Sequence, residues 1–327
     1  MRYRKLGKTG YLVSEIGFGT WGIGGQWGDV QDDLSLAALH AAADAGVTFF
    51  DTADVYGDGR SERLLGTFLR ERKGERLFVA TKIGKQVPVD IANYTRANFR
   101  AWVDQCRERL GTDMLDLVQL HCLPTDVYYH PELFEFLEEL KSEGALAHYG
   151  VSIVRIEEGL KAIEYPGIAT IQVVYNIFRQ RPAERLLEAA NACDVGVIAR
   201  VPLASGLLAG SMRPDTEFSA ADHRAFNRQG EAFDVGETFS GVEFETGLAA
   251  VERLRPLVPP DTPMSQFALR WILMNQAVTT AIPGAKRPDQ ARANAAASDL
   301  LPLPRATMEA LAEIYRSDIA PMVHQRW

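Results

Sequence analysis

The chain has 327 residues, 46% of them hydrophobic, which is enough for one large α/β barrel or for two ordinary domains. Its formal net charge of −8 argues against nucleic-acid binding, because proteins that bind nucleic acid usually carry a basic face. The sequence contains no run of about 18 apolar residues and no apolar signal core near its N-terminus. We therefore expect a cytoplasmic protein with neither a membrane nor a nucleic-acid partner.

The hydrophobic pattern predicts strands and helices that alternate along the whole chain. Residues 2–5 and 12–15 flank a Lys-Thr-Gly turn and favour a small opening β-hairpin. Eight apolar runs rich in β-branched residues follow, of the kind typical of parallel strands that are buried on both faces. These runs span residues 16–21, 47–51, 77–81, 115–121, 147–152, 169–173, 195–200 and 278–282.

Helical patterns lie between the predicted strands. Residues 34–45 are rich in alanine and end at Gly46, and residues 95–110 carry one apolar stripe and end at Gly111. Ser61 is expected to be the N-cap of the helix that follows it. Three further helices open at prolines and are expected over residues 131–140, over residues 182–190 and from residue 288 onward.

Eight β–α alternations favour a single α/β domain over residues 1–327, closed as a (β/α)8 barrel. The alternative is an open doubly wound sheet, which requires G-x-G-x-x-G after its first strand. The matching segment reads WGIGGQWG, so Trp27 occupies the position of the third glycine. Residues 205–241 form a long polar loop after the seventh strand, typical of a functional lid or a disordered segment. The tail from residue 307 is expected to be a helix with an irregular end.

Ionisable side chains stand at the ends of neighbouring predicted strands. Asp51 ends the second strand, Lys82 follows the third and His121 ends the fourth, while Tyr56 lies in the loop just after Asp51. The carboxyl ends of the strands in a (β/α)8 barrel meet at the mouth that holds the active site. Each residue alone has an ordinary structural explanation, such as a buried ion pair for Lys82. Four together at one mouth predict a catalytic group.

These segments resemble the aldo-keto reductase superfamily over essentially the whole chain. DTADVYGDGRSERLLG is similar to the family's signature around its catalytic Asp and Tyr, and VATK, DLVQLH and IPGAKRPDQARAN match later blocks in the family's order. The resemblance implies reversible, NADPH-dependent reduction of a small aldehyde or ketone. It implies that the catalytic tetrad is Asp51, Tyr56, Lys82 and His121.

The chemistry of carbonyl reduction agrees with these roles. Hydride delivery to a carbonyl leaves an alkoxide that needs a proton from a nearby acid. A free tyrosine has a pKa of about 10, and the Lys82 ammonium is expected to lower the pKa of Tyr56. Asp51 is expected to keep Lys82 charged, and His121 to hydrogen-bond the carbonyl oxygen.

The resemblance also implies cofactor contacts at matching positions. Ser152 and Gln172 are expected to hold the nicotinamide carboxamide. Lys286 and Arg287 precede the helix start at Pro288, where cations and backbone N–H groups favour a 2'-phosphate and hence NADPH over NADH. The full set of predicted cofactor-binding residues is Gly19, Thr20, Trp21, Ser152, Gln172, Tyr175, Arg200, Pro202, Leu203, Ser205, Gly206, Gly284, Lys286, Arg287, Gln290 and Asn294.

Three positions depart from the family pattern. Ile153 follows Ser152 where the family often has Asn, which removes one amide contact. Ala293 stands where some members have Glu. Arg200 replaces the aromatic residue that commonly stacks on the nicotinamide. A planar guanidinium also stacks on rings, but its charge beside an oxidised nicotinamide requires neutralisation.

The substrate side of the site is less specific. The predicted pocket walls are Trp21, Trp27, Cys122 and Tyr128, which suit many aldehydes and ketones. Two other functions stay open at this stage: a redox-sensing regulatory protein that binds NADPH with little turnover, and an aldolase that forms a Schiff base on Lys82. No metal site is expected, because the histidines and the three cysteines show no ligand-spaced pairs. Neither the substrate nor the oligomeric state follows from the sequence.

Overall fold

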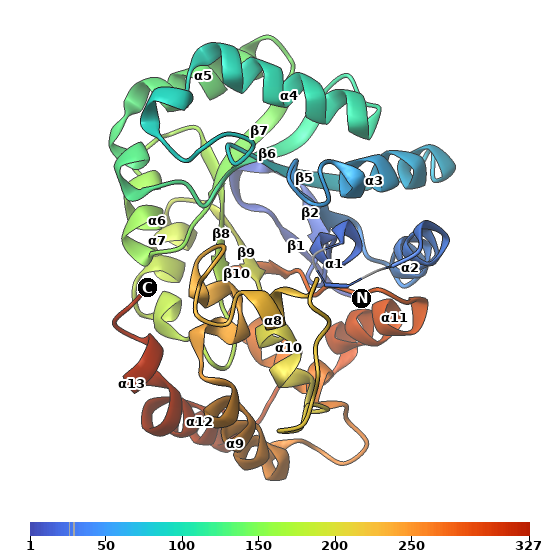
Figure 1. Cartoon of the computed structure of the whole chain (residues 1–327), viewed down its shortest axis with the longest axis vertical. Helices are drawn as coiled ribbons and strands as arrows, with labels where there is room; N and C mark the ends of the chain where they lie inside the picture. Colours follow the sequence, from blue (N-terminus) through green and yellow to red (C-terminus); the bar gives the residue numbers. More distant parts are fainter. Residues whose placement is uncertain (26, 29) are drawn as a thin grey trace.

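The computed structural model describes residues 1–25, 27–28 and 30–327, and its eight-stranded sheet curls around a central axis (Figure 1). Each strand is parallel to, and hydrogen-bonded with, the next strand along the chain. The strands are β3 (Phe18–Gly19), β4 (Phe49–Asp51), β5 (Phe78–Ile83), β6 (Leu115–His121), β7 (Leu146–Ser152), β8 (Ile168–Val174), β9 (Gly196–Arg200) and β10 (Val278–Ala281).

Backbone contacts between the two edge strands close the sheet into a barrel. Ile16 bridges Ala281, and Gly19 bridges Gly284, both in parallel register. The Gly19 N–H donates to the carbonyl oxygen of Pro283 at 3.1 Å. A Cβ on Gly19 would lie 2.7 Å from the carbonyl oxygen of Ile282, so this close approach requires glycine. The predicted (β/α)8 barrel is confirmed.

The predicted N-terminal hairpin is also present. Strands β1 (Tyr3–Lys5) and β2 (Leu12–Ser14) pair in antiparallel register beneath the barrel. Leu6, in the turn between them, is fully buried and joins Phe49, Phe78 and other inward-facing residues of the strands in one apolar cluster. The hairpin therefore seals the amino ends of the strands, and the carboxyl ends remain as the mouth.

Helices surround the strands (Figure 1). Helix α4 shows why the local prediction succeeds: Thr95 Oγ1 accepts from the Asn98 N–H, and Gly111 ends the helix with φ 68°. The outer helices are α2 (Asp32–Asp44), α3 (Arg60–Glu71), α4 (Arg96–Leu110), α5 (Pro131–Ser142), α6 (Ile156–Ala162), α7 (Leu186–Ala192), α10 (Met264–Leu273) and α11 (Pro288–Ala296).

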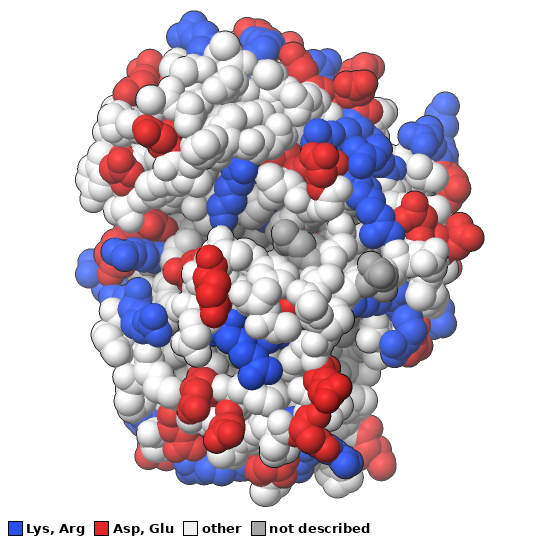
Figure 2. All heavy atoms as spheres, in the orientation of Figure 1, with Lys and Arg blue, Asp and Glu red and all other residues white. Residues whose placement is uncertain are grey.

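Further helices extend the outer layer. α1 (Trp21–Gly24) follows β3, α8 (His223–Phe226) lies inside the long loop after β9, and α9 (Phe244–Leu254) comes directly after that loop. The tail contains α12 (Arg305–Ile314) and α13 (Ala320–Val323), so the expected helix with an irregular end is present. Among the described residues, no helix has the length and apolar character that crossing a bilayer requires. Acidic and basic side chains are both scattered over the face in Figure 2, between areas of uncharged residues.

Three local predictions are wrong. Gly59, with φ 76°, is the N-cap of α3, whereas the Ser61 hydroxyl donates to Thr20 Oγ1 at 2.6 Å. Residues around Pro182 form a 3-10 turn, and α7 begins only at Leu186, because Arg185 has non-helical angles. The first strand is shorter than predicted, since Trp21 already begins a helix.

Candidate active site

The barrel brings the four predicted catalytic residues together at its mouth. Lys82 Nζ lies 2.5 Å from Asp51 Oδ1 and 3.3 Å from Tyr56 Oη. It also donates to the carbonyl oxygen of Thr52 at 2.8 Å. The rings of Tyr56 and His121 meet nearly edge to face, with centroids 5.7 Å apart. Asp51 and Lys82 are buried, while Tyr56 is partly exposed and therefore faces the mouth.

Two amide side chains hold the Asp51 carboxylate in addition to Lys82. Gln172 Nε2 donates to Asp51 Oδ2 at 2.7 Å, and Gln119 Nε2 donates to the same oxygen at 3.3 Å. A buried charge needs such partners, because its desolvation is otherwise uncompensated. Gln172 was predicted to contact the nicotinamide carboxamide. The structure shows that its side chain also donates to Asp51. Gln119 was not predicted, since nothing in its sequence neighbourhood separates it from a core strand residue.

The charge states at the mouth differ from one of our expectations. Although the residue as a whole is partly exposed, the phenol group of Tyr56 is enclosed at the mouth. This burial, followed by the negative charge of Asp51, raises the pKa of Tyr56 well above its usual value. The pKa of Tyr56 is thus raised and not lowered as expected, and the positive charge that opposes this rise is that of Arg200. Burial, followed by the positive charges of Lys85 and Lys82, lowers the pKa of His121 well below its usual value. His121 is thus a neutral imidazole, and its buried Nδ1 has no hydrogen-bond partner among the described residues.

Aromatic side chains line one side of the mouth. Trp21 stacks on Tyr56 with centroids 6.1 Å apart, and Trp27 meets Trp21 edge to face at 5.4 Å. His223 and Phe233 of the long loop complete the cluster, at 4.7 Å and 5.8 Å from Trp21. Sequence reasoning missed these two residues, because the loop has no periodic pattern. The sequence signal that could have found Phe233 is that phenylalanines recur in this otherwise polar segment, at positions 218, 226, 233 and 239.

Arg200 lies at the carboxyl end of β9 and is neutralised there. Its Nη1 lies 2.5 Å from both carboxylate oxygens of Glu237, and its Nη2 donates to the carbonyl oxygen of Ile153 at 2.8 Å. Burial opposes the charge of Arg200, but Glu237 outweighs this effect and raises the pKa of Arg200. Burial likewise opposes the charge of Glu237, yet Arg200 holds the pKa of Glu237 below its usual value. The neutralising carboxylate was not predicted.

Cys122 and Ser152 lie beside this ion pair. Cys122 Sγ lies 3.6 Å from Arg200 Nη2 and 3.4 Å from Ser152 Oγ. The structure thus places a predicted pocket wall, a predicted carboxamide contact and Arg200 in one group.

The segment after β9 turns sharply toward the long loop. Val201, Ala204 and Ser205 adopt left-handed backbone angles, with φ of 49°, 48° and 54°. A β-branched residue is rarely found there, which marks Val201 as strained. Ser205 Oγ donates to the carbonyl oxygen of Glu237 and accepts from the Phe239 N–H, both at 3.0 Å. Ser205 therefore links the start of the long loop to its end near Glu237 and Phe239. The predicted cofactor contacts of Pro202, Leu203, Ser205 and Gly206 stay predictions.

The predicted phosphate site lies at the start of α11. The Lys286 ammonium donates to the carbonyl oxygen of Trp27, and the Lys286 N–H donates to Gln290 Oε1 at 2.9 Å. Asn294 Nδ2 donates to the carbonyl oxygen of Gly284 at 3.2 Å. These bonds place Lys286 between α11 and the mouth. Arg287 is exposed and paired with Asp289 at 3.1 Å.

Three other predicted site residues have clear structural surroundings. Thr20 ties two strands together, because its N–H and its hydroxyl both donate to the carbonyl oxygen of Asp51. Tyr175 packs on Trp271 of α10 with centroids 5.0 Å apart, which indicates a core role. Tyr128 is fully buried, and its hydroxyl has no hydrogen-bond partner among the described residues. Their ligand contacts stay predictions.

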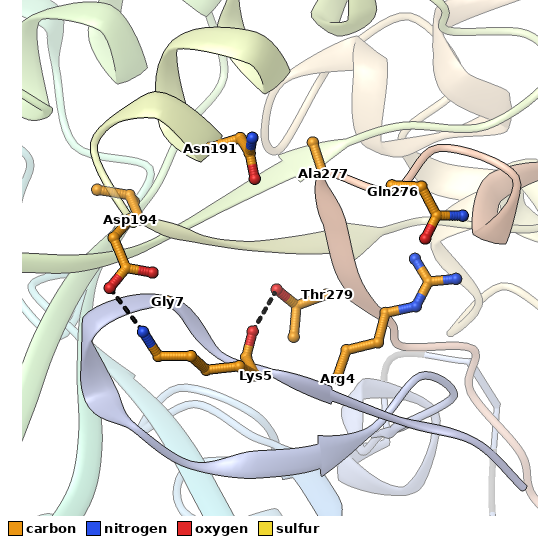
Figure 3. Close-up of a pocket in the computed structure, with 9 residues that line it drawn as sticks. Arg4, Lys5, Gly7, Asn191, Asp194, Gln276, Ala277 and Thr279 are labelled. Carbon is orange, nitrogen blue, oxygen red and sulfur yellow. Dashed lines mark hydrogen bonds and ion pairs between the residues drawn. The ribbon is translucent and has the colours of Figure 1, made fainter.

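A surface cavity of about 320 Å³ lies far from this group, at the hairpin end of the barrel (Figure 3). Lys5 and Asp194 both line this cavity and form an ion pair, with 2.8 Å between Lys5 Nζ and Asp194 Oδ2. None of its lining residues was predicted to bind a ligand. Within the described part of the chain, His, Cys, Asp and Glu side chains form no group of three or more that could hold a metal ion.

A (β/α)8 barrel that gathers ionisable side chains at the carboxyl ends of its strands is typical of an enzyme. The family model described as the Aldo/keto reductase family matches residues 15–316. The chain therefore belongs to the aldo-keto reductase family of oxidoreductases.

Individual relatives agree with this assignment. The chain is 31% identical to Aldo-keto reductase YhdN of Bacillus subtilis, over 90% of this chain and 87% of that protein. It is 28% identical to the NADH-specific methylglyoxal reductase of Escherichia coli, over 92% and 94%. Its structure is similar to that of an aldo-keto reductase from Bacillus halodurans in its holo form, with a TM-score of 0.77, 27% identity and 96% of each chain covered.

Proposed function

We propose that this protein reduces the carbonyl group of a small aldehyde or ketone, with NADPH as the hydride donor and Tyr56 as the proton donor. The observation that carries the proposal is the bond from Lys82 Nζ to Tyr56 Oη, 3.3 Å long, at the barrel mouth. It links a partly exposed acid to a buried ammonium. The reverse reaction, from alcohol to carbonyl, uses the same groups.

Tyr56 fits the role of proton donor. A phenol is protonated near neutral pH already at its ordinary pKa of about 10, and the raised pKa of Tyr56 does not change this. When Tyr56 releases its proton to the substrate oxygen, the phenolate that remains accepts from Lys82 and is stabilised by the ammonium charge. Asp51 holds Lys82 in place through the 2.5 Å ion pair. The three residues therefore form a chain in which each orients the next.

His121 fits the role of positioning the carbonyl. The lowered pKa keeps the imidazole neutral, so one ring nitrogen donates and the other accepts. A substrate oxygen placed between Tyr56 and His121 would accept from both. Two donors aimed at that oxygen stabilise the negative charge that develops there during reduction.

The residues at the mouth fit a nicotinamide dinucleotide, which supplies the hydride when bound. Arg200 offers a planar guanidinium, whose Nε is buried without a hydrogen-bond partner among the described residues. Lys286 and Arg287 are two cations at the N-terminus of α11. A 2'-phosphate bound there would take the place of the Trp27 carbonyl oxygen on Lys286 and of Asp289 on the exposed Arg287. Because the Escherichia coli relative is named NADH-specific, family membership alone leaves the choice of dinucleotide open. Lys286 and Arg287 are the basis on which we propose NADPH.

The contacts of Lys82 disfavour the aldolase alternative. Its three protons are directed to Asp51 Oδ1, to the carbonyl oxygen of Thr52 and to Tyr56 Oη. A Schiff base requires a neutral amine with a free lone pair. This arrangement stabilises the ammonium instead.

The test is NADPH consumption with a panel of aldehydes and ketones, together with NADPH binding. Turnover with at least one carbonyl supports the proposal. NADPH binding without turnover across the panel would favour the regulatory alternative. Covalent trapping of a carbonyl compound on Lys82 by borohydride, without NADPH consumption, would favour the aldolase.

A further inference from the structure

The ion pair between Arg200 and Glu237 joins the barrel to the long loop at the mouth. Arg200 is the last residue of β9, and Glu237 belongs to a short 3-10 turn of the loop, η6 (Val235–Glu237). The pair is largely buried, with side-chain exposures of 9% and 16%. The charge of Arg200 is therefore neutralised only while the loop holds Glu237 beside it.

Trp327 holds this part of the loop from behind. Its indole N–H donates to Asp234 Oδ1 at 3.0 Å, just before η6. A Cβ on Gly236 or Gly241 would lie 3.0 Å or 2.4 Å from the indole ring, so the ring packs directly on the loop backbone. Trp327 is 4% exposed. Trp327 therefore contacts the loop both before and after Glu237 in the sequence, at Asp234 and at Gly241.

A second buried cation, Arg179, lies near Arg200. Arg179 lies over the Trp327 ring at 4.0 Å and donates to the carbonyl oxygen of Ser240 at 3.4 Å. Burial, followed by the positive charge of Arg200, lowers the pKa of Arg179 to about 9. Asp234 and Tyr315 also face Arg179 and favour its charge more than Glu237 does. Without Glu237, Arg200 would lose its own carboxylate, and its charge would repel both Arg179 and any further cation.

We propose that Glu237 sets the ratio of the affinities for oxidised and reduced dinucleotide, and that Trp327 is a positioning residue that acts through Glu237. The inference rests on the proposed function, because it takes Arg200 as the neighbour of the nicotinamide ring. That ring carries a positive charge in NADP+ and none in NADPH. A neutralised Arg200 tolerates both states, whereas an uncompensated Arg200 disfavours NADP+.

The test is calorimetric titration of the full-length protein with NADP+ and with NADPH. In Glu237→Gln, the Kd for NADP+ is expected to rise at least about fivefold more than the Kd for NADPH, the lower end of coupling between two interacting sites. The matched control is Glu231→Gln, an exposed carboxylate of the same loop, which should leave the ratio unchanged.

Trp327 is tested by two substitutions. Trp327→Phe keeps a packed ring but loses the bond to Asp234, and it should shift the ratio in the same direction as Glu237→Gln by a smaller factor. Trp327→Ala should shift it further. Equal weakening of both dinucleotides would show that Trp327 is merely structural, and would overturn its positioning role. Circular dichroism checks folding, and Trp327→Phe keeps the test available if Glu237→Gln does not fold.

A wrong role for Glu237 and a wrong proposed function give different binding results. If both dinucleotides bind to Glu237→Gln with the wild-type ratio of Kd values, the role of Glu237 is overturned while the proposed function stands. If the wild type binds neither dinucleotide, the proposed function itself fails, and this inference fails with it.

Discussion

Replacing Lys82 with methionine is expected to destabilise the protein far more than the loss of an ordinary surface ion pair. Lys82 and Asp51 lie 2.5 Å apart, with side-chain exposures of 1% and 3%. Methionine preserves the length of the side chain but leaves the Asp51 carboxylate in the interior, where the amides of Gln172 and Gln119 donate to it. Breaking a buried pair in this way costs about 3–5 kcal/mol of unfolding free energy.

Urea unfolding measures this cost, and the chain contains a matched control. Lys5 and Asp194 form an ion pair at 2.8 Å with exposures of 58% and 56%. Lys5→Met should therefore cost no more than about 1 kcal/mol. The double variant Asp51→Asn/Lys82→Met leaves no unpaired charge, and it should be more stable than the sum of the single losses by about 0.5–3 kcal/mol. A loss in Lys82→Met no larger than that in Lys5→Met would refute the reasoning.

Two further predictions concern charge at other positions. Burial, followed by the negative charge of Glu62, raises the pKa of Asp54 to about 7, whereas an aspartate in the unfolded chain titrates near about 4. The folded protein then keeps a proton that the unfolded chain has released. The unfolding free energy of the wild type relative to Asp54→Asn should therefore fall as the pH rises from about 4 to about 7 and then level off. A difference that stays constant over this range, measured by urea unfolding, would contradict the assignment. Lys286→Met should weaken NADPH binding about tenfold or more, because a hydrogen bond to a charged group contributes about 1.5–3 kcal/mol, and should leave NADH binding unchanged. Arg292→Met, at an exposed position of the same helix, is the control, and equal weakening of both dinucleotides would remove the 2'-phosphate site.

The strands and the site residues on them were predictable because burial leaves a simple pattern. β6 and β8 are apolar runs that the barrel buries on both faces, so their ends could be placed from sequence to within one residue. Asp51, Lys82 and His121 could be assigned to one mouth because parallel strands in a barrel place their carboxyl ends together.

The burial pattern could not predict which residues of the long loop reach the mouth. Glu237, His223 and Phe233 reach the mouth through tertiary contacts of a segment without periodicity, so no local signal predicts which of its residues point inward. The N-cap of α3 was misassigned for a related reason. Ser61 has the chemistry of a cap, but its bond to Thr20, distant in sequence, competes for the hydroxyl. The pKa of Tyr56 also depends on burial, which spacing along the chain does not give.

The most direct test of the central claim is a single-turnover measurement of NADPH oxidation by a carbonyl compound from the panel. It compares the wild type with Tyr56→Phe and with the exposed control Tyr129→Phe, each saturated with NADPH. Loss of a general acid should slow the reaction of Tyr56→Phe by about 10²- to 10⁴-fold, while Tyr129→Phe should react like the wild type. A rate in Tyr56→Phe equal to that of the wild type would contradict the assignment of Tyr56 as the proton donor.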